Sequence, residues 1–130
     1  MKKILLLEDD LCLSEIVYEF LVEEGFDVSL THNAKEAYEL STKSEYDLYI
    51  LDVKIPIKDG FSLLKEIRER GDNTPALFLT SLNTNKDLKE GFKSGCDDYI
   101  VKPFQLNILK KHIVELLFYK KRKRYQLQDT

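Results

Sequence analysis

The chain has 130 residues, of which 43% are hydrophobic and 33% are charged, as is typical of one well-solvated globular domain. Its apolar runs are too short for a membrane-spanning helix, and the opening MKKILLLEDD has neither the apolar length nor the cleavage site of a secretion signal. The formal net charge of −3 combines an acidic body with a basic run at residues 120–124, so the body does not resemble a nucleic-acid-binding surface.

Five short runs rich in leucine, β-branched and aromatic side chains are predicted to be strands. They cover residues 3–7, 26–30, 47–51, 75–79 and 99–101. Segments of helical length separate these runs and follow the last one. Five strand–helix units in a row predict a doubly wound α/β fold, in which helices cover both faces of a parallel sheet.

The segments outside the strands place apolar side chains at helical spacing. The first carries Leu13, Ile16, Val17, Phe20 and Leu21, the second Ala34, Ala37, Tyr38 and Ser41, the third Phe61, Leu64 and Ile67, and the last, from about residue 106, Leu109, Ile113, Leu116 and Leu117. The fourth, residues 85–94, has only Leu88 and Phe92 as large anchors and is therefore the most weakly held. Gly25, Gly71 and Gly95 are expected to end three of these helices.

Cysteine and histidine do not form a site in this sequence. Cys12 and Cys96 have no metal-ligand spacing, and we interpret both as buried thiols of a cytoplasmic protein. His32 is interpreted as a loop residue and His112 as a residue of a helix face. Any metal bound here is therefore expected to have oxygen ligands.

Polar side chains gather where the predicted strands end. They are Glu8, Asp9 and Asp10 after the first strand, Asp52 after the third, Thr80 and Ser81 after the fourth, and Lys102 and Pro103 after the fifth. Each has an ordinary explanation alone, since Asp10 could cap a helix, Thr80 could open a turn and Lys102 could be a surface lysine. In open parallel sheets, however, ligands bind beyond the carboxyl ends of the strands, so the shared edge indicates a functional site.

Electrostatics indicates what such a site would bind. The carboxylates of Glu8, Asp9 and Asp52, if about 5 Å apart, would repel one another by roughly 3 kcal/mol per pair at an effective dielectric constant of about 20. Either one of them is protonated or a cation lies between them. Oxygen donors favour Mg²⁺ over Zn²⁺, and a metal with a lysine opposite suits phosphoryl oxygens. Asp52 is therefore predicted to be a nucleophile that accepts a phosphoryl group.

These residues resemble a known family. Glu8-Asp9-Asp10, Asp52 followed by Pro56 and Gly60, Thr80, and Lys102-Pro103-Phe104 together resemble the receiver domain of bacterial two-component response regulators. The likeness extends from residue 2 to about residue 119. The stretch GCDDYIVKPF is most similar to the subfamily in which a winged-helix DNA-binding domain follows the receiver. The resemblance implies a flavodoxin-like sheet with strand order 2-1-3-4-5.

The resemblance also implies a role for each matched position. Asp52 would accept the phosphoryl group from a phosphohistidine on a sensor histidine kinase. Asp9 and Asp52 would bind Mg²⁺ directly, Glu8 would bind it through a water, and the backbone carbonyl of Lys54 would complete the protein ligands. Such a domain catalyses only its own phosphorylation and dephosphorylation and is not otherwise an enzyme.

A second group of residues would transmit the signal. Thr80 would hydrogen-bond a phosphoryl oxygen, Lys102 would pair with it, and the peptide bond before Pro103 would be cis. Tyr99 would turn inward as Thr80 moves, so that a local charge change biases a bistable element, with the helix at 85–94 as the part that moves. Lys54 departs from the family pattern, in which a neutral residue is common there. Its ammonium group could contact the phosphoryl group or obstruct the hydrolytic water.

The family pattern also suggests a homodimer through the fourth helix, fifth strand and fifth helix. The interface candidates are Leu88, Phe92, Asp97, Asp98 and Ile108. Leu88 and Ile108 replace charged residues of the usual network, and His112 stands where an arginine is usual. The phosphorylation-driven dimer is therefore either lost or dependent on apolar contacts.

Three other functions fit parts of the sequence. A receiver-like docking module that is never phosphorylated would not need the full set of chemical residues. A phosphatase with an aspartyl-phosphate intermediate usually carries its nucleophile on the first strand. A flavin or dinucleotide module would need a glycine-rich loop after that strand, where this sequence has acids.

The domain organisation follows from where the pattern ends. Residues 1–119 are predicted to form the receiver domain, and residues 120–130 to begin an interdomain linker. We expect the natural protein to continue into an effector domain. Contact with DNA would then be made only through that effector.

Overall fold

Strands and helices alternate along the chain as the sequence predicts. The protein is described here by a computed structural model that covers residues 1–119. Its elements are β1 (Lys3–Leu7), α1 (Leu11–Glu23), β2 (Asp27–Thr31), α2 (Ala34–Lys43), β3 (Leu48–Leu51), α3 (Gly60–Glu69), β4 (Ala76–Thr80), α4 (Asn85–Ser94), β5 (Asp98–Val101), α5 (Leu106–Val114) and the π-helical turn η1 (Glu115–Tyr119). The predicted linker at 120–130 lies outside the described residues.

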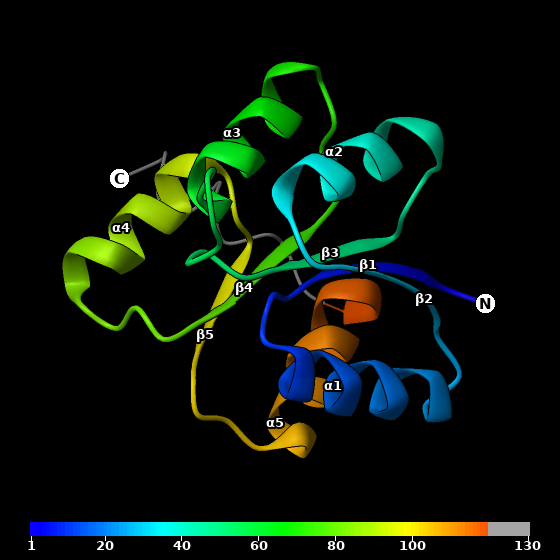
Figure 1. The fold of residues 1–130 in the computed structure, drawn as a ribbon. Coiled ribbons are helices and arrows are strands. Elements are labelled where there is room, and N and C mark those ends of the chain that lie inside the picture. Colours follow the sequence, from blue (N-terminus) through cyan, green and yellow to red (C-terminus); the bar gives the residue numbers. More distant parts are fainter. Residues whose placement is uncertain (120–130) are drawn as a thin grey trace.

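The five strands form one parallel sheet in the order β2-β1-β3-β4-β5. Helices α2, α3 and α4 cover one face, and α1 and α5 cover the other (Figure 1). The predicted doubly wound, flavodoxin-like α/β fold with strand order 2-1-3-4-5 is therefore confirmed. The sheet order changes direction at β1 and β3, whose carboxyl ends precede Glu8 and Asp52.

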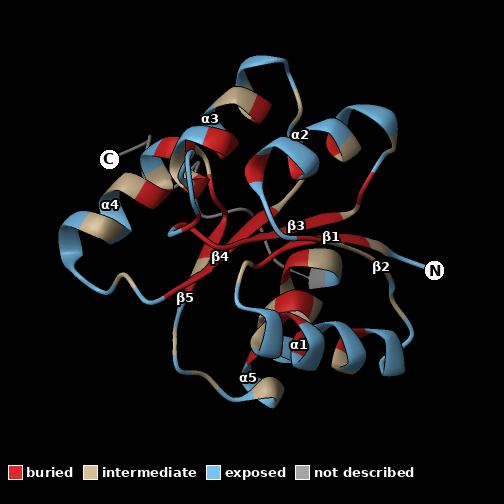
Figure 2. Ribbon diagram, viewed as in Figure 1, coloured by how far each residue is buried: buried red, intermediate tan, exposed pale blue. Residues whose placement is uncertain are grey.

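Burial on both faces explains why the strands are apolar at nearly every position. Alternate residues point to opposite sides, so Leu5 and Tyr49 pack under α2 and α3, whereas Ile4 and Ile50 pack against α1 and α5. The central strands are buried almost throughout (Figure 2). The burial of these leucine, isoleucine and tyrosine side chains fixes the strand registers, because a shift by one residue would exchange the two faces.

Helices α1 to α4 begin at capping side chains, whereas Gln105 before α5 makes no such bond. In Asp10, Asn33, Asp59 and Thr84 a side-chain oxygen accepts a hydrogen bond from the backbone N–H three residues later. Asp10 therefore caps α1, which is the ordinary role that the sequence offers for it. At its other end α4 is followed by Gly95, whose φ of 110° lies in the left-handed region.

Several sequence-based expectations about exposure are wrong. Ile16 was expected to face inward but is 52% exposed, because the buried stripe of α1 is formed by Ser14, Val17 and Leu21. Cys12, predicted to be buried, is exposed on the same helix, whereas Cys96 is buried as expected.

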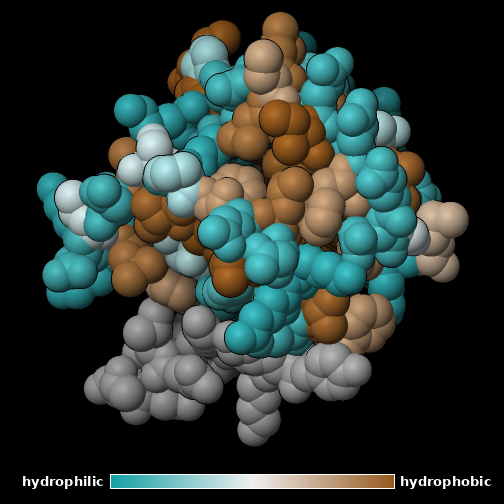
Figure 3. All heavy atoms as spheres, turned by 90° about the horizontal axis from the view of Figure 1, so that it is seen from below, coloured by the Kyte–Doolittle hydropathy of each residue, from teal (hydrophilic) through white to brown (hydrophobic). Residues whose placement is uncertain are grey.

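Apolar side chains gather on the face that α1 and α5 form (Figure 3).

The fourth helix is held differently from the prediction. Leu88 was expected to anchor it but is 41% exposed. The buried residues of α4 are instead Gly91 and Ser94, with Phe92 partly buried. Gly91 lies close to Tyr99, because a Cβ atom there would be 3.0 Å from the ring and the ring would have to shift. None of the helices in residues 1–119 is both long and apolar enough to span a bilayer.

Candidate functional site

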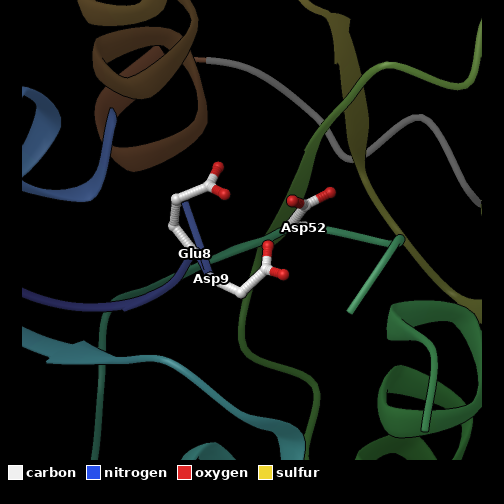
Figure 4. Close-up of side chains that lie close together, drawn as sticks. All are labelled: Glu8, Asp9 and Asp52. Atoms are coloured by element: carbon white, nitrogen blue, oxygen red, sulfur yellow. The ribbon is translucent and has the colours of Figure 1, made fainter. Parts of the chain in front are cut away.

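The predicted acidic residues meet at the carboxyl edge of the sheet. Glu8 and Asp9 follow β1, Asp52 follows β3, and one carboxylate oxygen from each lies within 4.8 Å of the others. The three side chains converge on one point (Figure 4). Glu8 is 1% and Asp52 is 4% exposed, whereas Asp9 remains accessible to solvent. This separation is close to the value of about 5 Å at which strong repulsion between the three carboxylates is expected.

Lys102 bridges the two buried acids. Its Nζ donates to Glu8 Oε1 at 2.6 Å and to Asp52 Oδ2 at 3.0 Å. Burial raises the pKa of Glu8 to about 7, and the nearby Asp52 carboxylate adds to this rise, although the hydrogen bond from Lys102 opposes it. Burial lowers the pKa of Lys102, but its bonds to both carboxylates outweigh that effect and raise it. The site therefore carries more negative charge than one lysine neutralises.

The loop after β3 holds Asp52 through close backbone packing. The backbone N–H of Gly60 donates to Val53 O at 2.9 Å, and a Cβ atom at Gly60 would lie 2.2 Å from Asp52 O. Only glycine fits there, which explains its place in the sequence motif. The backbone N–H of Lys54 donates to Asp52 Oδ1 at 3.3 Å, and the Lys54 side chain is exposed beside the site.

Thr80 and Tyr99 are connected through Leu82. Thr80 is fully buried at the end of β4, and its Oγ1 accepts a hydrogen bond from Leu82 N at 3.4 Å. The Tyr99 hydroxyl donates to Leu82 O at 2.8 Å, and its ring packs edge-on against Phe78. Burial raises the pKa of Tyr99 to about 12, so the hydroxyl is a donor at neutral pH. The β4–α4 loop thus connects the predicted phosphoryl-binding hydroxyl to the predicted switch residue.

Two further features lie near the site. The first was implied by the family resemblance, and the second was not predicted. The Lys102–Pro103 peptide bond is cis in the structure. His32, interpreted as a loop residue without a role, places Nδ1 2.9 Å from the carbonyl oxygen of Glu8. Its position directly after β2, at the same sheet edge as the acids, was the signal that could have indicated this contact.

The interface candidates divide into exposed and buried residues. Leu88 and Ile108 are 41% and 42% exposed, and Phe92 is partly buried. Asp97 and Asp98 are 0% and 2% exposed. These two carboxylates can be buried because each is bonded to other groups of the chain.

Those internal bonds are specific. Asp97 Oδ2 accepts from the backbone N–H of Ala76 at 2.9 Å and lies 3.4 Å from the guanidinium of Arg68. Asp98 Oδ2 lies 2.6 Å from Nδ1 of His112. His112, interpreted as a helix-face residue only, therefore ties α5 to β5. The sequence could not show this pair because the contact depends on how α5 packs against β5.

Comparison with known proteins places this geometry in context. Residues 4–114 match the family model described as the response regulator receiver domain. The chain is 44% identical over 117 residues to the transcriptional regulatory protein CiaR of Streptococcus pneumoniae, covering 90% of this chain and 52% of that protein. It is 43% identical over 113 residues to the transcriptional regulatory protein CrdR of Helicobacter pylori, covering 86% and 53%. The chain thus spans about half the length of the curated relatives it matches.

Solved structures give the same picture. A Francisella response regulator receiver domain superposes with a TM-score of 0.86 at 34% identity, covering 90% of this chain and 97% of that one. The receiver domain of a Pseudomonas aeruginosa sensor histidine kinase superposes with a TM-score of 0.83 at 26% identity, covering 89% and 97%. That structure has a magnesium ion coordinated in its active-site cleft.

Proposed function

The chain belongs to the response regulator receiver family, and we propose that Asp52 accepts a phosphoryl group from a sensor histidine kinase in a Mg²⁺-dependent reaction. The observation that carries this proposal is the convergence of Glu8, Asp9 and Asp52 on one point, with Lys102 bonded to two of them. A cluster built only to cap helices would not bring a partly buried lysine to the same place. In this proposal, the domain changes its state when Asp52 is phosphorylated and catalyses no reaction on any other substrate.

The donor set fits a magnesium ion. All side-chain donors are carboxylate oxygens, and three carboxylates face the one ammonium group of Lys102. Asp9 and Asp52 would hold the ion directly, with Glu8 and the backbone carbonyl of Lys54 completing the ligands. When bound, Mg²⁺ would neutralise part of this charge and attract phosphoryl oxygens.

The chemical step assigned to the chain is a transfer to carboxylate. An oxygen of Asp52 forms a new bond to phosphorus as the phosphorus–nitrogen bond of the donor phosphohistidine breaks, and the leaving nitrogen keeps the electron pair. Lys102 already contacts Asp52 Oδ2, so its ammonium group is positioned to pair with the incoming phosphoryl oxygens. Burial of Asp52 limits the access of water to the new mixed anhydride.

The switch proceeds through Leu82. A Thr80 hydroxyl that bonds the phosphoryl group would release the Leu82 N–H, and movement of Leu82 would alter its bond to the Tyr99 hydroxyl. The adjoining α4 buries only Gly91 and Ser94, so it can shift at little cost. We assign the signalling change to the face formed by α4, β5 and α5.

The output is proposed to be transcriptional. The relatives of twice this length are named transcriptional regulatory proteins. We propose that the natural protein continues beyond residue 130 into a DNA-binding domain of the winged-helix type, through which alone it contacts DNA. The cytoplasm, where DNA and kinase domains meet, is the compartment that this role requires.

Incubation with acetyl phosphate tests the proposal without a kinase. With Mg²⁺, the intact mass should rise by one phosphoryl group, and chelation of Mg²⁺ should abolish the rise. Asp52→Asn should show no rise, whereas Asp59→Asn, which keeps a helix cap at an exposed acid, should behave as wild type. A correctly folded wild type that gains no mass would support the unphosphorylated docking module instead.

A further inference from the structure

Ile57, in the β3–α3 loop, combines two unfavourable features. Its φ of 75° lies in the left-handed region, which β-branched residues rarely adopt. Its side chain is fully exposed, at 108% of the reference area, so no packing inside the chain compensates for the strained backbone. A glycine or asparagine would relieve the strain, and a polar residue would suit the exposure. A contact outside the chain would account for both features.

Ile57 stands at the rim of an apolar groove. The groove has a volume of about 690 Å³, runs between the start of α2 and the β3–α3 loop, and is lined by Tyr38, Pro56 and Leu63 as well as by Ile57. The guanidinium of Arg70 lies 4.9 Å from the centre of the Tyr38 ring, a cation–π contact that favours the present position of that wall.

The edge of the groove carries both signs of charge. Lys35 and Glu39 lie one turn apart on α2, and Lys58 forms an ion pair with Glu66. A rim that carries both signs of charge does not favour a strongly acidic or a strongly basic partner. It can be complementary to a second copy of itself, because a lysine of one copy can face a glutamate of the other.

We propose that this surface binds a second copy of the chain about a two-fold axis, with Ile57 of each copy in the groove of the other. An isologous interface requires a projection and a matching hollow on the same face, and here they are adjacent. The same symmetry would place Lys35 of one copy opposite Glu39 of the second. The groove and the site share the carboxyl edge of the sheet, but this pairing needs neither Mg²⁺ nor phosphorylation.

Sedimentation equilibrium from micromolar to millimolar concentration, with chelator and without a phosphoryl donor, tests the proposal. Wild type should self-associate, and Ile57→Gly should weaken the dimer by about tenfold or more. Because glycine tolerates the left-handed backbone, Ile57→Gly should melt no lower than wild type. Ile108→Ala, which removes a comparably apolar side chain from the opposite edge of the fold, is the matched control and should leave association unchanged.

A charge exchange gives a second, independent test. Lys35→Glu should weaken association, and Lys35→Glu combined with Glu39→Lys should restore it. A chain that stays monomeric at millimolar concentration overturns the proposal, and the groove then serves a different protein. Equal dimerisation of wild type and Ile57→Gly, or an equal loss in Ile108→Ala, overturns it as well. None of these outcomes depends on phosphorylation of Asp52.

Discussion

Glu8 shows how one buried acid links stability, pH and metal binding. Its pKa is raised from 4.5 to about 7, chiefly by burial, so the folded state binds a proton more tightly than the unfolded state does. The stability that Glu8 contributes is fully present below pH 4.5 and is lost as the pH rises to about 7. Without a divalent ion, the ionised carboxylate is therefore a local cost at neutral pH.

Glu8→Gln tests this at the residue scale. In chelator at neutral pH, the variant should unfold at higher urea concentration than wild type, with a gain of about 1–3 kcal/mol. The gain should shrink as the pH falls below the raised pKa, because wild type is then protonated too. Magnesium should stabilise wild type more than the variant. A difference between the proteins that does not change with pH would contradict the assignment.

Lys54 is the second residue with a distinctive consequence. Its backbone N–H donates to the Asp52 carboxylate and its side chain is exposed, so we expect the ammonium group to reach a phosphoryl group on Asp52. We expect Lys54→Ala to shorten the lifetime of phosphorylated Asp52 by about twofold to fivefold, the scale of an exposed charge pair. Lys54→Met, which keeps the length without the charge, separates electrostatics from obstruction of water. Mass spectrometry after removal of the donor gives the decay rates, and equal rates in all three proteins would exclude a role for the side chain.

At the scale of elements, α4 and the loop before it are the parts that we propose to move. The Tyr99 hydroxyl holds that loop through Leu82 O. Tyr99→Phe removes one buried hydrogen bond and should cost about 1 kcal/mol of local stability. Amide exchange in the β4–α4 loop should speed up severalfold, while the mass gain from acetyl phosphate persists. Unchanged exchange would show that the hydroxyl does not restrain the loop.

The face of α4, β5 and α5 makes a separate prediction. Leu88, Val101 and Ile108 are all exposed on it, whereas Asp98 of β5 is buried. If phosphorylation drives dimerisation there, we expect the contact to use these apolar side chains. Leu88→Ser combined with Ile108→Ser should therefore abolish any dimer that beryllofluoride and Mg²⁺ induce, without affecting the phosphate-independent association through Ile57. An induced dimer that survives both changes would place the contact elsewhere.

Elements were predictable where local pattern and tertiary packing agree. The apolar runs of β1 and β3 and the Gly95 stop of α4 define strands and helix ends in the sequence itself. The fit of Gly91 against Tyr99 was not predictable, because it depends on how closely α4 approaches the sheet. The same holds for Asp98, whose burial depends on His112 from another element.

At the scale of the whole molecule, the parallel topology is what makes the site predictable from the sequence. Parallel strands bring all their carboxyl ends to one edge, so Glu8, Asp9, Asp52 and Lys102 could be placed together before any coordinates were known. The pairing of Lys102 with both Glu8 and Asp52, and the contact of His32 with Glu8, required the structure. So did the exposure and backbone conformation of Ile57, since neither is encoded in a periodic pattern.

The most direct test of the central claim is a crystal structure determined with Mg²⁺ and beryllofluoride. We predict beryllofluoride on Asp52, a magnesium ion held by Asp9 and Asp52, and Lys102 Nζ in contact with a fluorine atom. The hydroxyl of Thr80 should contact the same group, with Tyr99 displaced from its present bond to Leu82. An unmodified Asp52, with Lys102 still bonded to Glu8 and no metal among the three acids, would contradict the account.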